Sequence, residues 1–196
     1  MKKTLLLLCL CALSFRGLCQ QFDLGIIAGP NVSTFIPPAS QEPGGVIKYS
    51  ALAGFHAGVI FQVAVGSIYI QPGMVYETIG GKLNAYDDDF GGGPFSLTSS
   101  LQYLQVPLNI LYHTKSGKFF FGGGPYVAFG ISGNVTHNTT SGSATYKFVF
   151  SGSNNPEFGL NLIGGVRVPG NFIFTAGASF AEQNKVYNLS IGRMFW

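Results

Sequence analysis

The sequence predicts an all-β fold, an eight-stranded antiparallel up-and-down transmembrane β-barrel. Three observations indicate it: segments alternate apolar and polar residues, the polar positions hold mostly Gly, Asn, Gln, Ser and Thr, and tight turns alternate with long connections. Such alternation places the two faces of a strand in different environments. A polar face in bulk water would be expected to be charged, whereas the interior of a narrow barrel with lipid outside suits this composition.

Charged residues are scarce along the chain. They make up 10% of it, against about 25% in soluble domains. After the first residues, no stretch is long and apolar enough for a membrane-spanning helix, which needs about 20 apolar residues. The 28 glycines, most of them inside alternating segments, also disfavour helices. A membrane barrel fits best, because its closure pairs every strand edge.

The first 19 residues have the pattern of a secretory signal peptide. Two lysines precede the apolar run Leu5–Leu13, and Ser14–Cys19 follows as a cleavage region. We predict cleavage after Cys19, which leaves 20–196 as the barrel domain. The alternative is a lipoprotein acylated at Cys19, and it is disfavoured because Leu18 is larger than the residue expected there.

Loss of this segment changes the available chemistry. All three cysteines lie in it, so the mature chain has no disulfide, no thiol nucleophile and no cysteine metal site. It also holds three of the eleven Lys and Arg residues, which leaves eight basic against eight acidic residues. We therefore predict no nucleic-acid partner, and we expect neither a cofactor nor a metal.

Eight strands follow from the alternation. The first four are expected at 22–34, 52–63, 68–80 and 101–113. The fifth begins at 118 and runs to about 131, the sixth ends near 168, and the last two are expected at 172–181 and 187–196. Tight turns are expected at 64–67, 114–117 and 169–171, and long connections at 35–49, 81–100 and 132–157. Bacterial transmembrane barrels have short periplasmic turns and long external loops, so the long connections are predicted to be external.

The connection 132–157 contains a further alternating segment, Thr145–Phe150. We interpret it as part of a projecting hairpin with its tip near Ser141–Ser143. An added pair of strands is the alternative, and it is disfavoured because eight segments already follow an up-and-down order.

Aromatic residues gather near both ends of the expected strands. Near the short turns these are Phe61, Tyr69, Tyr112, Phe119, Phe172 and Phe195; near the long connections they are Tyr76, Phe129, Phe158, Phe180 and Tyr187. Core packing is the usual role of aromatic residues. Two groups at opposite ends of outward faces match interfacial girdles better.

Several of these segments together resemble a known family, the small outer-membrane β-barrel proteins of Gram-negative bacteria (porin superfamily, "outer membrane protein β-barrel domain", PorT-like). The segments are Gly25–Ser33, Ala53–Phe61, Ile70–Tyr76, Tyr103–Tyr112, Phe121–Phe129, Phe158–Val166 and Ile191–Trp196. The resemblance covers nearly all of the predicted mature chain and implies location in the outer membrane, with lipid as its surroundings. It implies little about activity.

The resemblance also implies a partner during assembly. The end of the chain is similar to the aromatic-terminated last strand that the barrel-assembly machinery recognises, with Phe195 and Trp196 as the assembly signal. The alternation of Tyr187, Leu189 and Ile191 places Phe195 on the lipid face. It leaves open which aromatic residue serves as the signal.

Two charged residues are expected to face the interior near the periplasmic end. Asp23 lies between outward Phe22 and Leu24, and Arg167 lies between two valines. A lone buried charge is costly, so we predict an interior ion pair that serves structure rather than catalysis. Glu77 also has inward parity, but near the external end, where we expect it to be solvated.

The remaining candidates for chemistry are weak. Asp87, Asp88 and Asp89 suit calcium by residue type, but their spacing favours a solvated acidic turn. Some small outer-membrane barrels are hydrolases that use His and Ser. His56 has inward parity, and no Ser or acidic residue has an evident place beside it, so no catalytic residue is predicted.

The sequence therefore predicts a non-enzymatic outer-membrane barrel with a structural or surface-interaction role in its external loops, where it would meet an extracellular ligand or protein. With eight strands, the interior is wide enough only for side chains to fill it, so a plugged barrel rather than a pore is expected. Two alternatives are a secreted lipocalin-like barrel for a small apolar ligand and an outer-membrane enzyme acting on lipid.

Overall fold

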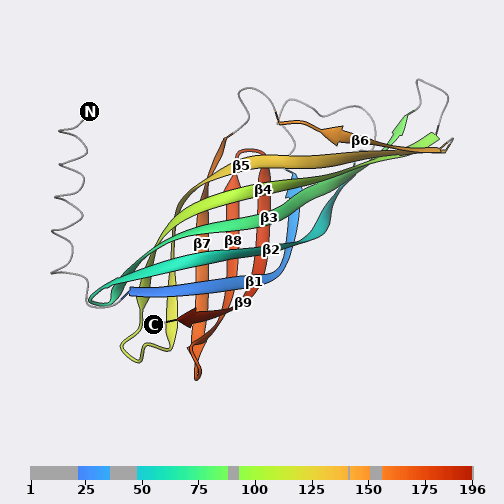
Figure 1. Cartoon of the computed structure of the whole chain (residues 1–196). Helices are drawn as coiled ribbons and strands as arrows, with labels where there is room; N and C mark the ends of the chain where they lie inside the picture. Colours follow the sequence, from blue (N-terminus) through green and yellow to red (C-terminus); the bar gives the residue numbers. More distant parts are fainter. Residues whose placement is uncertain (1–21, 36–47, 88–92, 141, 151–155, 196) are drawn as a thin grey trace, which may run out of the picture.

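Residues 22–35, 48–87, 93–140, 142–150 and 156–195 are described by the structure, a computed structural model. They form nine strands (Figure 1): β1 (Phe22–Phe35), β2 (Lys48–Val65), β3 (Ile68–Asp87), β4 (Gly93–His113), β5 (Phe119–Thr139), β6 (Gly142–Phe148), β7 (Glu157–Val168), β8 (Phe172–Ala181) and β9 (Asn184–Phe195). Within these residues, no helix is long and apolar enough to cross a membrane.

Eight of the strands close into an antiparallel ring. The order is β1-β2-β3-β4-β5-β7-β8-β9, and β9 pairs back with β1. Among the described strands, β6 pairs only with β5. The predicted eight-stranded up-and-down barrel is therefore confirmed, and β6 lies outside the ring.

The three short turns lie where the sequence predicts them. Each contains a glycine with positive φ, at 66° in Gly66, 66° in Gly117 and 84° in Gly170. A residue with a side chain rarely adopts this conformation. The ends of the barrel strands at Phe22 and Phe195 lie at the same end of the barrel as these turns.

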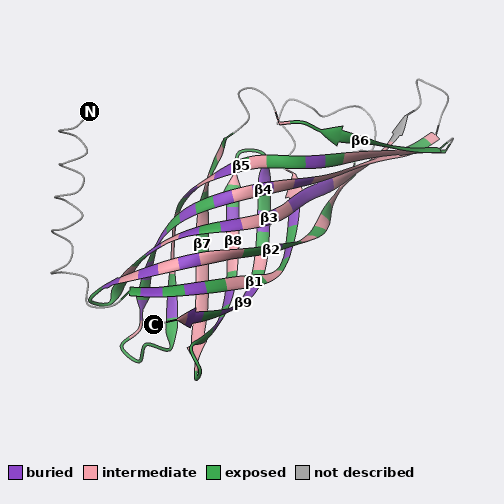
Figure 2. Cartoon of the chain, viewed as in Figure 1, coloured by how far each residue is buried: buried purple, intermediate pink, exposed green. Residues whose placement is uncertain are grey.

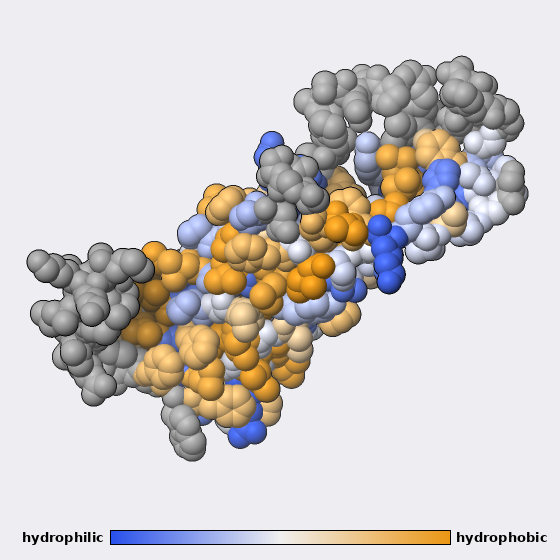
Figure 3. Space-filling view, turned by 45° about the horizontal axis from the view of Figure 1, so that its top comes forward, coloured by the Kyte–Doolittle hydropathy of each residue, from blue (hydrophilic) through white to orange (hydrophobic). Residues whose placement is uncertain are grey.

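Alternation of burial along the strands confirms the predicted faces (Figure 2). On β4, Tyr103, Gln105 and Asn109 point inward and are buried, whereas Leu108 and Ile110 point outward with 48% and 58% of their surface exposed. The outer surface of the barrel is apolar, as Figure 3 shows for the face in view. This is the arrangement expected of a barrel surrounded by lipid.

The prediction of a long loop at 81–100 is wrong for most of its length. β3 continues to Asp87 and β4 begins at Gly93, with pairs running from Gly81↔Ser99 to Asp87↔Gly93. Residues 88–92 lie outside the described part. The many serines and threonines near 96–100 suggest a loop, but Ser96, Thr98 and Ser100 occupy the polar face of a paired strand.

The predicted projecting hairpin is formed by β5 and β6. They pair from Gly133↔Phe148 to Thr139↔Gly142, so the hairpin turns one or two residues before the expected tip. A register shift between β4 and β5, from Gln102↔Ser132 to Tyr103↔Gly130, gives β5 one extra residue. Such a bulge bends a strand and increases its twist, and it lies where β5 leaves the ring.

The aromatic girdles are present with one correction. Phe119, Phe158 and Tyr187 are 58%, 69% and 54% exposed on the outer surface. Tyr69 is not part of the lower girdle, because it points inward and stacks on the His113 ring with centroids 3.8 Å apart. Its neighbours Ile68 and Ile70 take the outward positions.

A lysine on the outer surface should lower the stability of the barrel only where that surface lies within the hydrocarbon core of the membrane. Leu162 is 60% exposed in the middle of β7, and Ile131 is 56% exposed beyond the upper girdle on β5. We expect Leu162→Lys to lower the free energy of unfolding from bilayers by about 2–4 kcal/mol and Ile131→Lys by about 0–1 kcal/mol. Denaturant titration in lipid vesicles measures both, and equal effects would contradict this placement of the membrane.

Candidate functional site

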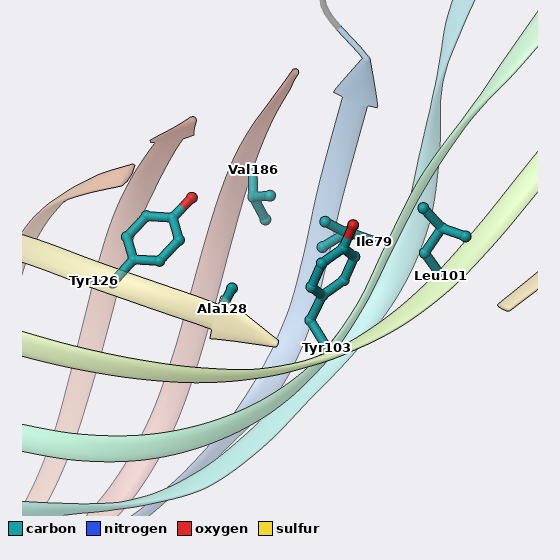
Figure 4. Close-up of a cluster of buried hydrophobic side chains, with 6 residues drawn as sticks. All are labelled: Ile79, Leu101, Tyr103, Tyr126, Ala128 and Val186. Carbon is teal, nitrogen blue, oxygen red and sulfur yellow. The ribbon is translucent and has the colours of Figure 1, made fainter. Parts of the chain in front are cut away.

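The candidate site is the barrel interior, which is layered along its axis. A lower apolar layer near the short turns consists of Ile60, Leu111, Phe120, Ile173 and Met194. An upper apolar layer consists of Ile79, Leu101, Tyr103, Tyr126, Ala128 and Val186 (Figure 4). The inward residues of β4 pass through both layers and, between them, supply Gln105, Pro107 and Asn109 to a polar layer.

Inward glycines provide the space for the large rings of these layers. A Cβ atom at Gly165 would lie 2.5 Å from Cζ of Phe120, and one at Gly159 would collide with the Tyr126 ring. The narrow barrel thus holds aromatic side chains across its width because their neighbours have no side chain.

Below the lower layer, the structure brings Asp23 and Arg167 together. Arg167 Nη2 lies 3.2 Å from Asp23 Oδ2 and donates a second hydrogen bond of 3.0 Å to Gln62 Oε1. The Asp23 side chain is 3% exposed and that of Arg167 is 21% exposed. Asp23 and Gln62 are also cross-strand partners on β1 and β2, so the contact joins three strands at the foot of the barrel.

A stack of three rings lies at the same end. The His113 ring is between Tyr69, with centroids 3.8 Å apart, and Phe120, with centroids 5.1 Å apart. The stack connects β3, β4 and β5. Together with the ion pair, it fills the lower end of the interior.

The polar layer lines a cavity of about 60 Å³. Direct hydrogen bonds cross or line it: His56 Nε2 to Ser190 Oγ at 2.7 Å, Gln105 Nε2 to Asn161 Oδ1 at 3.1 Å, and Asn109 Nδ2 to Gln71 Oε1 at 3.3 Å. We call this cavity and its polar lining the polar chamber. Side chains therefore do not fill the whole interior, as the plugged barrel predicts, because the polar chamber lies between the two apolar layers.

The surroundings of His56 correct the sequence prediction. Ser190 is its hydrogen-bond partner, and Glu77 lies directly opposite it on β3. Glu77 is 5% exposed, so the expectation that it is solvated at the mouth is wrong. Sequence reasoning missed the pair because His56 and Ser190 are 134 residues apart and meet only when the ring closes.

Ser, His and Glu are the residue types of a nucleophile, a base and an orienting acid. Here they face the interior, where His56 is 4% exposed and Ser190 is 8% exposed. The apolar layers lie on either side of them. A lipid chain on the outer surface therefore does not reach the Ser190 hydroxyl, and the pair is best explained as interior hydrogen bonding.

The other sequence candidates lie apart from this interior. Phe195 shares the outer face of β9 with Arg193, whose guanidinium lies 5.6 Å from the Phe195 ring and 5.5 Å from the Phe172 ring. Trp196, Asp88, Asp89 and the predicted signal peptide at 1–19 are outside the described residues. Among the described residues, no group of three or more His, Cys, Asp or Glu is placed to hold a metal ion.

A closed antiparallel ring with an apolar outer surface and aromatic girdles defines a membrane-spanning barrel protein. The chain belongs to the family described as outer membrane protein beta-barrel domain, whose model matches residues 14–182. The resemblance found in the sequence is thereby confirmed, and the protein is an outer-membrane β-barrel protein.

Two solved structures are similar in fold. Ail, the attachment invasion locus protein of Yersinia pestis in complex with the heparin analogue sucrose octasulfate, shares 11% identity with a TM-score of 0.47, covering 90% of this chain and 100% of Ail. OprG of Pseudomonas aeruginosa shares 13% identity with a TM-score of 0.42, covering 88% and 95%. These values are too low for a ligand to be transferred. No curated protein matches the chain.

Removal of the Arg167 guanidinium should leave the Asp23 carboxylate buried without its ion-pair partner. Loss of one member of a buried pair costs about 3–5 kcal/mol, and the partial exposure of Arg167 reduces this, so we expect Arg167→Met to destabilise the barrel by about 2 kcal/mol. Denaturant titration in lipid vesicles measures the effect. Arg193→Met, on the outer rim, is the matched control, and an Arg167→Met loss no larger than the control's would contradict the proposed role of the ion pair.

Proposed function

We propose that this protein is a non-enzymatic surface-interaction protein of the outer membrane, with a filled interior and a binding surface on its external strands. The observation that carries the proposal is the extension of β2–β6 beyond the ring. These strands continue past β1, β7, β8 and β9 as a projecting sheet (Figure 1). A protein with only an anchoring role does not need such an extension.

The two faces of the projecting sheet differ in character. Along one row of cross-strand neighbours the residues are Ser50, Lys82, Thr98, Thr136 and Thr145; along the adjacent row they are Tyr49, Leu83, Leu97, His137 and Ala144. Because successive residues of a strand point to opposite faces, one face is hydroxyl-rich and basic and the other is largely apolar. This amphipathic design favours a partner on the apolar face.

The apolar face ends in exposed side chains on β6. Tyr146 is 63% exposed and Phe148 is 42% exposed. An open hollow near the tip of the sheet is lined by Lys48, Asn84, Ser96 and Asn138 of the hydroxyl-rich face together with Ala85 and Phe95. The exposed aromatic residues of β6 are therefore the part of the sheet most typical of an interaction site.

The filled interior supports a role other than transport. Each apolar layer places large side chains inside a ring whose width accommodates little else. We infer that the protein reaches the membrane after cleavage of residues 1–19 and that the barrel-assembly machinery inserts it through its last strand. The apolar outer surface and the family exclude the soluble lipocalin-like alternative.

Photo-crosslinking on intact cells tests the proposed surface. A benzophenone amino acid in place of Tyr146, on the apolar face, should form a covalent adduct with a protein or glycan partner. The same amino acid in place of Thr145, exposed on the opposite face of the same strand, is the matched control. Adducts at 146 and not at 145 are expected; no adduct at either position, or equal adducts at both, would overturn the proposal.

A further inference from the structure

The polar chamber contains buried polar atoms that the protein does not satisfy. Within the described part of the chain, His56 Nδ1 and Asn109 Oδ1 have no hydrogen-bond partner. His56 is 4% exposed and Asn109 is 5% exposed, and both line the cavity. Leaving a buried polar atom without a partner is unfavourable, so two such atoms on one cavity indicate a ligand there.

Volume and chemistry limit what the ligand is. One water molecule needs at least about 15 Å³ of such space, and the cavity measures about 60 Å³, so it has room for more than one water molecule. Asn109 Oδ1 requires a donor. His56 Nδ1 requires a donor or an acceptor, depending on which ring nitrogen carries the proton in the bond to Ser190.

The walls of the chamber both donate and accept hydrogen bonds. They include the amides of Gln71, Gln105 and Asn161, the hydroxyl of Ser179 and the carboxyl of Glu77. A metal ion would accept nothing from the amide N–H groups of the wall, and among the described residues no group of three or more His, Cys, Asp or Glu could hold one. An anion without a proton would give nothing to Asn109 Oδ1, whereas water both donates and accepts. We propose that the polar chamber is a binding site for a small cluster of water molecules that completes the hydrogen bonding of His56 and Asn109.

The apolar layers give this water a definite boundary. Leu111 is the next inward residue after Asn109 on β4, belongs to the lower apolar layer and is 0% exposed. The water therefore ends within two residues of Asn109 on that side. Water held between two apolar layers exchanges slowly with bulk, and it gives cross-relaxation of the same sign as rigid protein protons.

Water–protein nuclear Overhauser spectroscopy on the folded protein in detergent micelles tests the site. We expect water cross peaks at the side-chain amide of Asn109 and at ring protons of His56, and none at the methyl groups of Leu111. Absence of cross peaks at both polar residues would overturn the proposal, as would cross peaks of equal strength at Leu111, which would indicate water throughout the interior.

Filling the chamber provides a second measurement. Val75 lines the cavity on β3, and Val75→Ile adds a methylene group there. We expect this variant to lose at least part of the Asn109 and His56 cross peaks. Val106→Ile makes the same change on the outer face of β4, where Val106 is 39% exposed, and should leave them unchanged. Undiminished cross peaks in Val75→Ile would place the water elsewhere and contradict the assignment.

Discussion

The constraint on which the structure depends is the need to pair every backbone amide and carbonyl inside a lipid bilayer. An unpaired group in hydrocarbon costs several kcal/mol, so strands cross a membrane only in a closed ring. Closure here is the pairing of β1 with β9, from Leu24↔Phe195 to Phe35↔Asn184. Without that pairing, both strands would present open edges to lipid, and the inward faces of the other strands would no longer enclose an interior.

Closure with eight strands makes the interior narrow, and this width determines which side chains fit inside. Space is short inside, and a large ring is accommodated where its cross-strand neighbour has no side chain, as Phe120 is beside Gly165. Polar side chains also meet across the interior and form hydrogen bonds with one another, as Gln105 and Asn161 do. The Asp23–Arg167 contact belongs to the same pattern, because each buried charge is compensated by the opposite charge of its partner. A filled, layered interior is therefore a consequence of strand number, and the external sheet is the part of the fold that closure does not determine.

Much of this architecture could be predicted from the sequence. Strand β8 spans Phe172–Ala181, as the alternation predicts, because its outward residues are apolar and, after Ile173, its inward residues are small or polar. The inward positions of Asp23 and Arg167 also follow from parity alone. The extension of β3 and β4 could not be predicted in this way, because Ser and Thr on a solvent-exposed strand face have the composition of a loop.

Other features depend on contacts between distant residues. A tyrosine is common both at the lipid interface and in barrel interiors, so residue type does not fix the direction of the Tyr69 side chain. Its stacking on His113 places it inside. The His56–Ser190 bond requires the register across the closing strands. The bulge in β5 after Phe129 changes which residues face inward beyond it. No local pattern in the sequence predicts any of these three features.

Disulfide formation across the closing strands tests ring closure most directly. All three natural cysteines lie in the predicted signal peptide, so a cysteine pair introduced at Ala28 and Ile191, which are Cα partners on the outer face of β1 and β9, would stand alone in the mature protein. Such partners lie about 4.5–5.5 Å apart, within disulfide range. The closed ring predicts rapid crosslinking of Ala28→Cys with Ile191→Cys in the membrane, and little crosslinking of Ala28→Cys with Phe174→Cys, which is one strand further away. Crosslinking of the second pair alone, or of neither pair, would contradict closure between β1 and β9.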